Sequence, residues 1–549
     1  MAKKKELNKK GESLLPVDCD HGKLLFPNLS VSFIQTFTLP YYLSFVCPKG
    51  GLISPYPDGI LLGEDLWSTD SHNPIPPSDH YMLPGFDFKI SFPMLYNTET
   101  GNWEEFHIKG KCSVKMVVFF GRTVSLKYHF HFNQQDCTSN RSFSVINLDT
   151  FLSFFLNTPF HSRVLPEAES SIFDFSTAEF NELPFDNSGN PLAEGLKQSL
   201  EVKADNGIKE AFDSIRRRYK GYIVKHGTKA MSALLYRSNK GKKDLSLAEI
   251  SDTKYAFVEL FPNFEDPMLD GRDFFSLDSK FVLSNKEVIT HIKEHHKSDL
   301  SVIMSLISDD VDSFEAHCGK ELLNEDESML YVGEKVAIYA STSDRFKQDI
   351  KGGNHKWSDE VRQKYNGVSW PSLLLIIQFA LAKKEVIQDA SSVLLRNAVA
   401  DDKRQNLTNI INRNQVVTFA LAQSMIQYDA AKFRVIDFKQ IDNQITEHLK
   451  VKQDRQEFEH NMKIIDDSLR NIKDGMASSR EITMNIILGI VSVISAFQLF
   501  FVGTKMPFLS DFWQIESGTI GALLITIVAG IAIFLVLGFL FSAIKSLVK

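Results

Sequence analysis

The chain has few cysteines and none of the short motifs that mark common enzyme classes. Its 549 residues include an odd number of cysteines without CxxC spacing: Cys19, Cys47, Cys112, Cys137 and Cys318. This pattern argues against a disulfide framework or a zinc site and favours a reducing compartment. A Walker loop, a GxGxxG after a strand, GxSxG and HExxH are also missing, so we expect no enzymatic activity.

A secretory signal is missing as well. Residues 1–23 form a basic tail that begins MAKKKELNKKG, without the apolar stretch that a signal peptide needs. The tail and the large part after it are therefore expected in the cytoplasm. With 23% charged residues the chain is no polytopic carrier, and with 11% aromatic residues it is no low-complexity polymer.

Charge is missing from two long runs near the C-terminus. Residues 482–504 and 517–544 contain no charged side chain, and a short loop, 505–516, joins them. Each run is long enough to cross a hydrocarbon core of about 30 Å as a helix. Basic residues precede the first run and lie in the final segment, 545–549, so both termini are predicted to be cytoplasmic. The sequence thus predicts an inner-membrane protein with two spans.

One stripe of the first predicted span is small or polar. At about 100° per residue its members fall on one side of a helix, which suits a pore or close helix packing. We predict as pore-lining Asn485, Gly489, Ser492, Ala496, Leu499 and Gly503 of this stripe, together with Thr504 and Lys505, which follow it toward the outer mouth. Two spans cannot enclose an aqueous path, so a conducting form requires a homo-oligomer.

Helix-breaking residues are missing ahead of the spans. No proline occurs between Pro371 and Pro507, and no glycine between Gly367 and Gly475. A helix is predicted to start near Pro371, and residues 396–481 are predicted to form a long helical stalk that enters the first span. The alternative for this segment is an ordinary amphipathic core helix.

Residues 24–395 predict a cytoplasmic α/β domain. Alternating side chains predict a β-hairpin about Gly121–Arg122, and a second hairpin is predicted at Gly333. His129 and His131 share one strand face, as metal ligands might be arranged, but a solvated polar face is the more common arrangement. No metal site is assigned from the sequence.

Acidic residues are missing between Arg216 and Lys243, although the chain as a whole has a net charge of −7. This basic insertion, 214–245, could bind the phosphate of a nucleotide, and interleaved tyrosines could stack on a base. A solvated insertion explains the composition equally well. The predicted phosphate ligands are Arg216, Arg217, Arg218, Lys220, Lys225, Arg237 and Lys240.

Taken together, an α/β domain, a stalk and two C-terminal spans resemble the CorA family of divalent-cation channels. The resemblance covers roughly residues 250–549, and it implies a pentamer whose first span lines the pore. Where the family has a Gly-Met-Asn signature, this chain has Gly503, Thr504 and Lys505. Five lysines at a pore mouth would repel a dication, so the chain looks more like the divergent CorA-like membrane effectors of type III CRISPR systems.

That branch implies a nucleotide second messenger, an adenosylmethionine–AMP conjugate, that acts on the cytoplasmic domain and opens the membrane in antiviral defence. No firmly bound cofactor and no direct nucleic-acid partner are expected. The alternative is a transporter for Mg²⁺, Co²⁺ or Ni²⁺, with ligands from the stalk residues Asp466, Asp467 and Asp474. A third possibility is that the spans only anchor a cytoplasmic domain.

Overall fold

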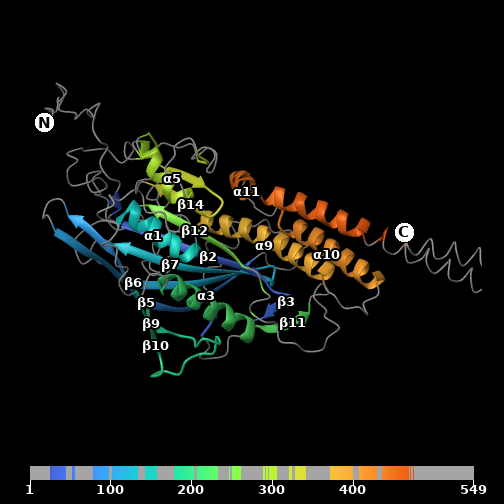
Figure 1. Ribbon diagram of the computed structural model, residues 1–549, viewed down its shortest axis with the longest axis horizontal. Coiled ribbons are helices and arrows are strands. Elements are labelled where there is room, and N and C mark those ends of the chain that lie inside the picture. Colours follow the sequence, from blue (N-terminus) through green and yellow to red (C-terminus); the bar gives the residue numbers. More distant parts are fainter. Residues whose placement is uncertain are drawn as a thin grey trace, which may run out of the picture. The chain divides into compact units, whose positions relative to one another are not determined.

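The structure is a computed structural model in which a long mixed sheet carries helices on its faces (Figure 1). It describes residues 25–44, 52–55, 78–97, 102–133, 143–157, 178–202, 207–232, 247, 250, 252–260, 289–305, 321–341, 371–399, 407–429 and 436–474, with short gaps inside some of these ranges. The two predicted spans, their loop and all eight predicted pore-lining residues, from Asn485 to Lys505, lie outside these ranges.

The strands are β1 (Leu25–Phe26), β2 (Asn28–Thr38), β3 (Tyr41–Ser44), β4 (Ser54–Pro55), β5 (Ser78–Asn97), β6 (Asn102–Phe119), β7 (Thr123–Asn133), β8 (Phe143–Ser144), β9 (Ala178–Leu183), β10 (Gln198–Val202), β11 (Thr228–Ser232), β12 (Thr253–Leu260), β13 (Ser328–Val332) and β14 (Val336–Ser341). The helices are α1 (Val145–Leu156), α3 (Gly207–His226), α5 (Lys297–Ser305), α9 (Pro371–Val399), α10 (Leu407–Gln427) and α11 (Ile436–His448).

The main sheet has the order β10-β9-β5-β6-β7-β2-β12-β14-β13, with β4 paired to β5 at one side. Its neighbours run antiparallel except β12 and β14, which are parallel. Two small sheets, β1-β8 and β11-β3, complete the strands of the described residues. The hairpins predicted at Gly121–Arg122 and at Gly333 are confirmed as β6–β7 and β13–β14.

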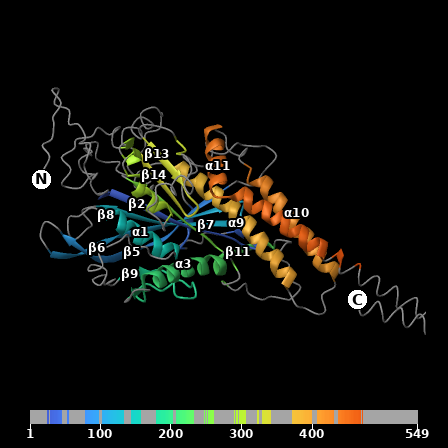
Figure 2. The same cartoon turned by 45° about the horizontal axis from the view of Figure 1, so that its top comes forward.

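One face of this sheet carries the main hydrophobic core. Alternation on β2 and β7 sends Phe33 and Phe130 to the side covered by α1 and α3 (Figure 2). Phe33 stacks on Phe155 of α1 with 3.8 Å between ring centroids, and it meets Phe212 of α3 edge-on at 5.9 Å. Burial of such rings contributes strongly to the stability of this face of the sheet.

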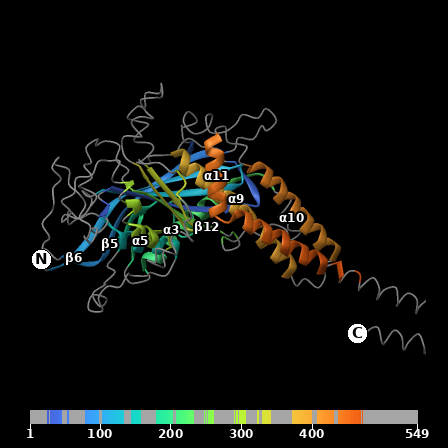
Figure 3. The ribbon, with the colours of Figure 1, turned by 90° about the horizontal axis from the view of Figure 1, so that it is seen from above.

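Helix α9 covers part of the opposite face. It starts at Pro371 as predicted, because proline fits the first helical turn, where its missing N–H has no partner to lose. Figure 3 shows α9 from above, running beside α10. Gln378 of α9 reaches the sheet and donates a hydrogen bond to the Ser125 hydroxyl of β7, with 3.0 Å between Nε2 and Oγ.

The fold class predicted from the sequence is wrong in its second half. The region 396–481 is divided: α10 ends at Gln427, α11 spans Ile436–His448, and helix resumes at 451 after a turn. Lys450 has a left-handed φ of 58°, which no α-helix can continue through. The described chain is a large mixed sheet with helices instead of a sheet domain on a long stalk.

Among the helices of the described ranges, none is both long and apolar enough to cross a membrane. The chain divides into two compact units, Met1–Asn397 with Gln415–Phe458, and Ala398–Asn414 with Glu459–Lys549. The first unit contains the whole main sheet together with α11 and the part of α10 from Gln415 onward.

Candidate anion-binding site

Five of the predicted phosphate ligands lie on α3, and its sequence places most of them against the sheet. Apolar residues recur at helical spacing from Ile208 to Ile223, so this face packs on the core and draws neighbouring cations inward. Arg216, Arg218 and Lys220 are buried, whereas Arg217 and Lys225 are exposed. The other two, Arg237 and Lys240, lie outside the described residues.

Arg218 and Lys225 bind the loop between β9 and β10. The Arg218 guanidinium donates to the backbone oxygen of Phe185 at 3.1 Å and to Asn187 Oδ1 at 2.8 Å. Lys225 Nζ donates to Asn190 Oδ1 at 2.6 Å. The side-chain and backbone N–H groups of Asn190 keep the pKa of Asp186 below its usual value, so this loop is held as a compact turn.

Gly189 sits at the tip of this loop and gives a direct test of its docking on α3. Its φ is +77°, and an added Cβ would lie 2.4 Å from the backbone nitrogen of Tyr222. We expect Gly189→Ala to lower the free energy of unfolding by about 2 kcal/mol, measured by urea denaturation, because it adds a clash to backbone strain. Gly195→Ala is the control: Gly195 also has positive φ, but nothing lies within 4 Å, so strain alone should cost about 1 kcal/mol.

Arg216 and Lys220 belong to a network of opposite charges. Arg216 pairs with Asp213, and Lys220 Nζ donates to the Ile250 carbonyl at 2.6 Å and approaches Asp252 Oδ2 at 3.4 Å. Burial alone raises the pKa of Asp252, but Lys220 and its other donors outweigh burial and lower it. Arg216, Arg218, Lys220 and Lys225 thus have partners within the chain, although Arg216 Nε and Nη1 are buried without a hydrogen bond, and phosphate binding by these cations stays a prediction.

A different basic cluster lies on the opposite face of the sheet. Alternation along β7 places Lys127, His129 and His131 on one side, next to a row of hydroxyls on β2. The Ser32 hydroxyl and His129 Nδ1 are 2.9 Å apart. This face is not the solvated one that strand patterns commonly indicate, because Lys127 is only 7% exposed and His129 only 2%.

Two lysines of this cluster stand directly opposite each other. Lys115 of β6 and Lys127 of β7 are register partners, and like charges in that position destabilise a sheet. Burial lowers the pKa of Lys127 to about 8, although the negative charge of Glu259 acts to raise it. Within the described part of the chain, no hydrogen bond or ion pair reaches the Lys127 ammonium. A buried cation without a hydrogen bond is costly, and such groups cluster at functional sites, so Lys127 is a candidate binding residue.

His80 of β5 adds a third nitrogen to the cluster. Burial first, and then the charges of Lys115 and Lys127, lower its pKa to about 4, so it is a neutral imidazole at pH 7. Glu259 of β12, the strand beyond β2, contributes a carboxylate. It accepts a hydrogen bond from the Ser30 hydroxyl, with 3.3 Å between Oγ and Oε2. We name this basic cluster the β7 site: His80, Lys115, Lys127, His129 and Glu259.

The β7 site is suited to an anion with several oxygen acceptors. Ammonium, imidazole N–H and serine hydroxyl groups all donate to phosphoryl oxygens, and a low-polarity surrounding strengthens each bond. Within the described ranges there is no group of three or more His, Cys, Asp or Glu side chains that could hold a metal ion. Asp466, Asp467 and Asp474 lie on the last helical segment, where Asp467 and Asp474 are exposed.

The sequence reasoning missed most of the β7 site because its members come from separate strands. His129 and His131 were visible through alternation, but Lys115 and His80 join them only through the register of β5, β6 and β7. A usable signal existed in the β6–β7 hairpin itself. Counting outward from the turn at Gly121 pairs Lys115 with Lys127 directly.

Comparisons with known proteins do not help to interpret the fold or the site. No protein-family model matches the chain, and no curated protein and no solved structure matches it. The resemblance to the CorA family accordingly remains a prediction, and the functional argument depends on the residues of the β7 site.

Proposed function

We propose that the protein is an effector that responds to a phosphate-bearing nucleotide, bound at the β7 site, by permeabilising a membrane. The observation that carries the proposal is the directly opposed lysine pair, in which Lys127 is buried and Lys115 is half-buried. A bound phosphate would neutralise that pair and turn an unfavourable arrangement into a favourable one. Glu259 offsets part of the charge of Lys127, and an anion would add a second group of opposite charge.

The chemical class of the ligand follows from the mixture of groups at the β7 site. Lys127 and Lys115 suit a phosphate, whereas the Glu259 carboxylate suits hydroxyl or amino donors such as those of a ribose or an amino acid. The adenosylmethionine–AMP conjugate implied by the family resemblance carries both kinds of group. A divalent cation fits this site poorly, since two ammonium groups would repel it.

The remaining parts of the proposal extend the sequence predictions. We place the protein at the inner membrane with both termini cytoplasmic, supported by the uncharged runs 482–504 and 517–544. We also propose a homo-oligomer, in keeping with the pentamers of the family that the chain resembles. CRISPR-linked antiviral defence is the process in which such an effector would act.

Calorimetric titration of the full-length protein with the conjugate tests ligand binding and its pH dependence. Because the pKa of Lys127 is about 8, we expect the dissociation constant to stay nearly constant between pH 6 and 7.5. Above pH 8 it should rise by up to about tenfold per pH unit as the ammonium loses its proton. Lys127→Arg should bind with little change up to pH 10, because a guanidinium stays charged.

Two outcomes would contradict the proposal. One is tight binding of the conjugate, and equally of AMP, that is unchanged in Lys127→Met. The other is the absence of any ligand-dependent release of a dye from vesicles of bacterial polar lipids that contain the wild-type protein. Lys111→Met is the matched control, because Lys111 lies on β6 as Lys115 does but is exposed.

A further inference from the structure

The turn between β6 and β7 holds an unusual backbone conformation. Phe120 has a φ of +50° and Gly121 a φ of +66°, and the Arg122 amide donates to the Phe119 carbonyl at 3.0 Å. Glycine adopts such values freely, but a phenylalanine there is strained. Strain at a non-glycine position persists only where surrounding contacts hold it, so the contacts of this turn are informative.

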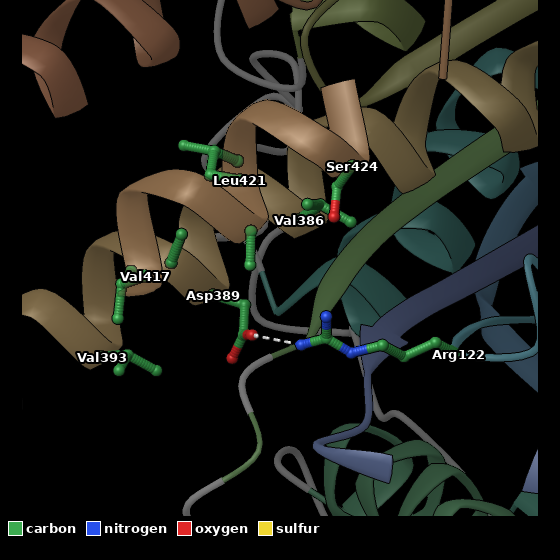
Figure 4. Close-up of a pocket in the computed structure, with 9 residues that line it drawn as sticks. Arg122, Val386, Asp389, Val393, Val417, Leu421 and Ser424 are labelled. Carbon is green, nitrogen blue, oxygen red and sulfur yellow. Dashed lines mark ion pairs between the residues drawn. The ribbon is translucent and has the colours of Figure 1, made fainter. Parts of the chain in front are cut away.

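Those contacts join the turn to two other parts of the same unit. Arg122 Nε donates to the Leu39 carbonyl at 2.7 Å, which ties the turn to the end of β2. Arg122 Nη2 also faces Asp389 Oδ2 of α9 at 3.8 Å (Figure 4). The two side chains are only 13% and 11% exposed, so water screens this ion pair weakly.

Aromatic rings place the same turn against both α9 and the residue that follows α10. Phe119 meets Phe379 of α9 with 5.7 Å between centroids, and Phe120 meets Tyr428 edge-on at 4.8 Å. Phe379 and Tyr428 are themselves 5.2 Å apart. The turn therefore contacts both helical segments at once, and its position affects how they pack.

The strand that leaves this turn carries the β7 site. Lys127 lies five residues after Arg122, and Ser125 lies between them on the same face of β7 as Lys127. Ser125 accepts the hydrogen bond from Gln378 of α9. Helix α9 thus contacts β7 at Ser125, two residues from the buried lysine, and contacts the turn again through Asp389.

A shallow groove lies between α9 and α10 beside the ion pair of Arg122 and Asp389. The groove is lined by Val386, Asp389 and Val393 of α9, by Val417, Leu421 and Ser424 of α10, and by Arg122. Figure 4 shows Arg122 reaching toward Asp389 beside this groove. At 3.8 Å the distance between Arg122 Nη2 and Asp389 Oδ2 is longer than a hydrogen bond, so the attraction between them is that of an ion pair.

We infer that Gln378 and Arg122 couple the charge state of the β7 site to the packing of α9 against the sheet. Neutralising Lys127 relieves its repulsion from Lys115 and changes the position of β7, and α9 follows through Ser125 and the turn. Coupling between two sites is reciprocal, so breaking the α9 contacts must change affinity at the β7 site in return. The role of the ligand in this inference rests on the proposed function, but the coupling itself does not.

The first test needs no ligand and measures backbone hydrogen–deuterium exchange in the full-length protein. Lys127→Met removes the charge, and we expect exchange rates in residues 376–390 of α9 to change at least threefold. Amides of α3 serve as the internal reference, since a global stability change would alter them as well. Adding Gln378→Leu and Asp389→Asn should abolish the α9 response, whereas Lys111→Met should produce none.

The second test uses the adenosylmethionine–AMP conjugate as the probe. Gln378→Leu combined with Asp389→Asn should change its dissociation constant at least threefold, although neither residue belongs to the β7 site. Identical α9 exchange in wild type and Lys127→Met, or a response that survives the double substitution, overturns the coupling. Failure of the probe to bind wild-type protein would instead overturn the proposed function, and the first test would still decide the coupling.

Discussion

Lys127→Met is expected to stabilise the folded protein at pH 7 while it weakens anion binding at least 100-fold. The pKa of Lys127 falls from its usual value near 10.5 to about 8, so the folded state holds this proton less tightly than the unfolded chain. By linkage, that shift costs folding about 1–3 kcal/mol at pH 7, and methionine removes the cost while keeping the aliphatic volume. Thermal and urea denaturation of both proteins would measure the gain.

The sign of the effect can be checked by varying pH. A depressed lysine pKa means that wild-type stability recovers as pH rises from 8 to about 10.5, where the unfolded chain alone still binds the proton. The stability difference between wild type and Lys127→Met should therefore shrink across that interval. A variant that is less stable than wild type at pH 7 would show that Lys127 is a structural residue, and it would remove the main support for the β7 site.

Lys383→Met is expected to have the largest cost, about 3–5 kcal/mol of unfolding free energy. Lys383 Nζ of α9 lies 2.5 Å from Asp442 Oδ2 of α11, and the Asp442 side chain is completely buried. Removing the lysine leaves an uncompensated carboxylate in the interior, which is far costlier than losing the pair as a whole. Burial already raises the pKa of Asp442 against the opposing effect of Lys383.

The double variant Lys383→Met with Asp442→Leu separates the pair from its parts. It should recover most of the lost stability, because an apolar pair needs no desolvation of charge. Arg470→Met is the exposed control, because the Arg470 side chain is 63% exposed. Its ion pair with Asp466 should contribute less than about 0.5 kcal/mol to the free energy of unfolding. A cost for Lys383→Met no greater than for Arg470→Met would show that the buried pair does not hold α9 and α11 together.

Local features of the fold were predictable because their signals are local. The β6–β7 hairpin follows from alternation on both sides of Gly121, and the start of α9 follows from Pro371. The break in the predicted stalk was harder to predict from the sequence. Lysine is common inside helices, and only the left-handed φ of Lys450 ends the helix there. Absence of proline and glycine permits a long helix but does not require one.

The functional prediction failed to locate the β7 site for a different reason. A run of positive residues in one segment is easy to see, yet Arg216, Arg218 and Lys220 lie on the face of α3 that also carries the apolar stripe. An apolar helix face determines what is buried, and cations next to it are buried with acidic or carbonyl partners. The β7 site gathers single cations from three strands, and only the sheet register brings them together.

The position of β2 in the sheet has a consequence for how the chain is made. β2 is central, between β7 and β12, although β7 ends at Asn133 and β12 begins at Thr253. During synthesis, the edge of β2 that will pair with β12 must wait for roughly 220 further residues, or about 10–45 s on a ribosome. Until then it presents unpaired backbone groups and Val, Phe and Ile side chains to its surroundings. The nascent chain should therefore depend on a chaperone. Aggregation of the incomplete chain should limit the yield of folded protein in overexpression.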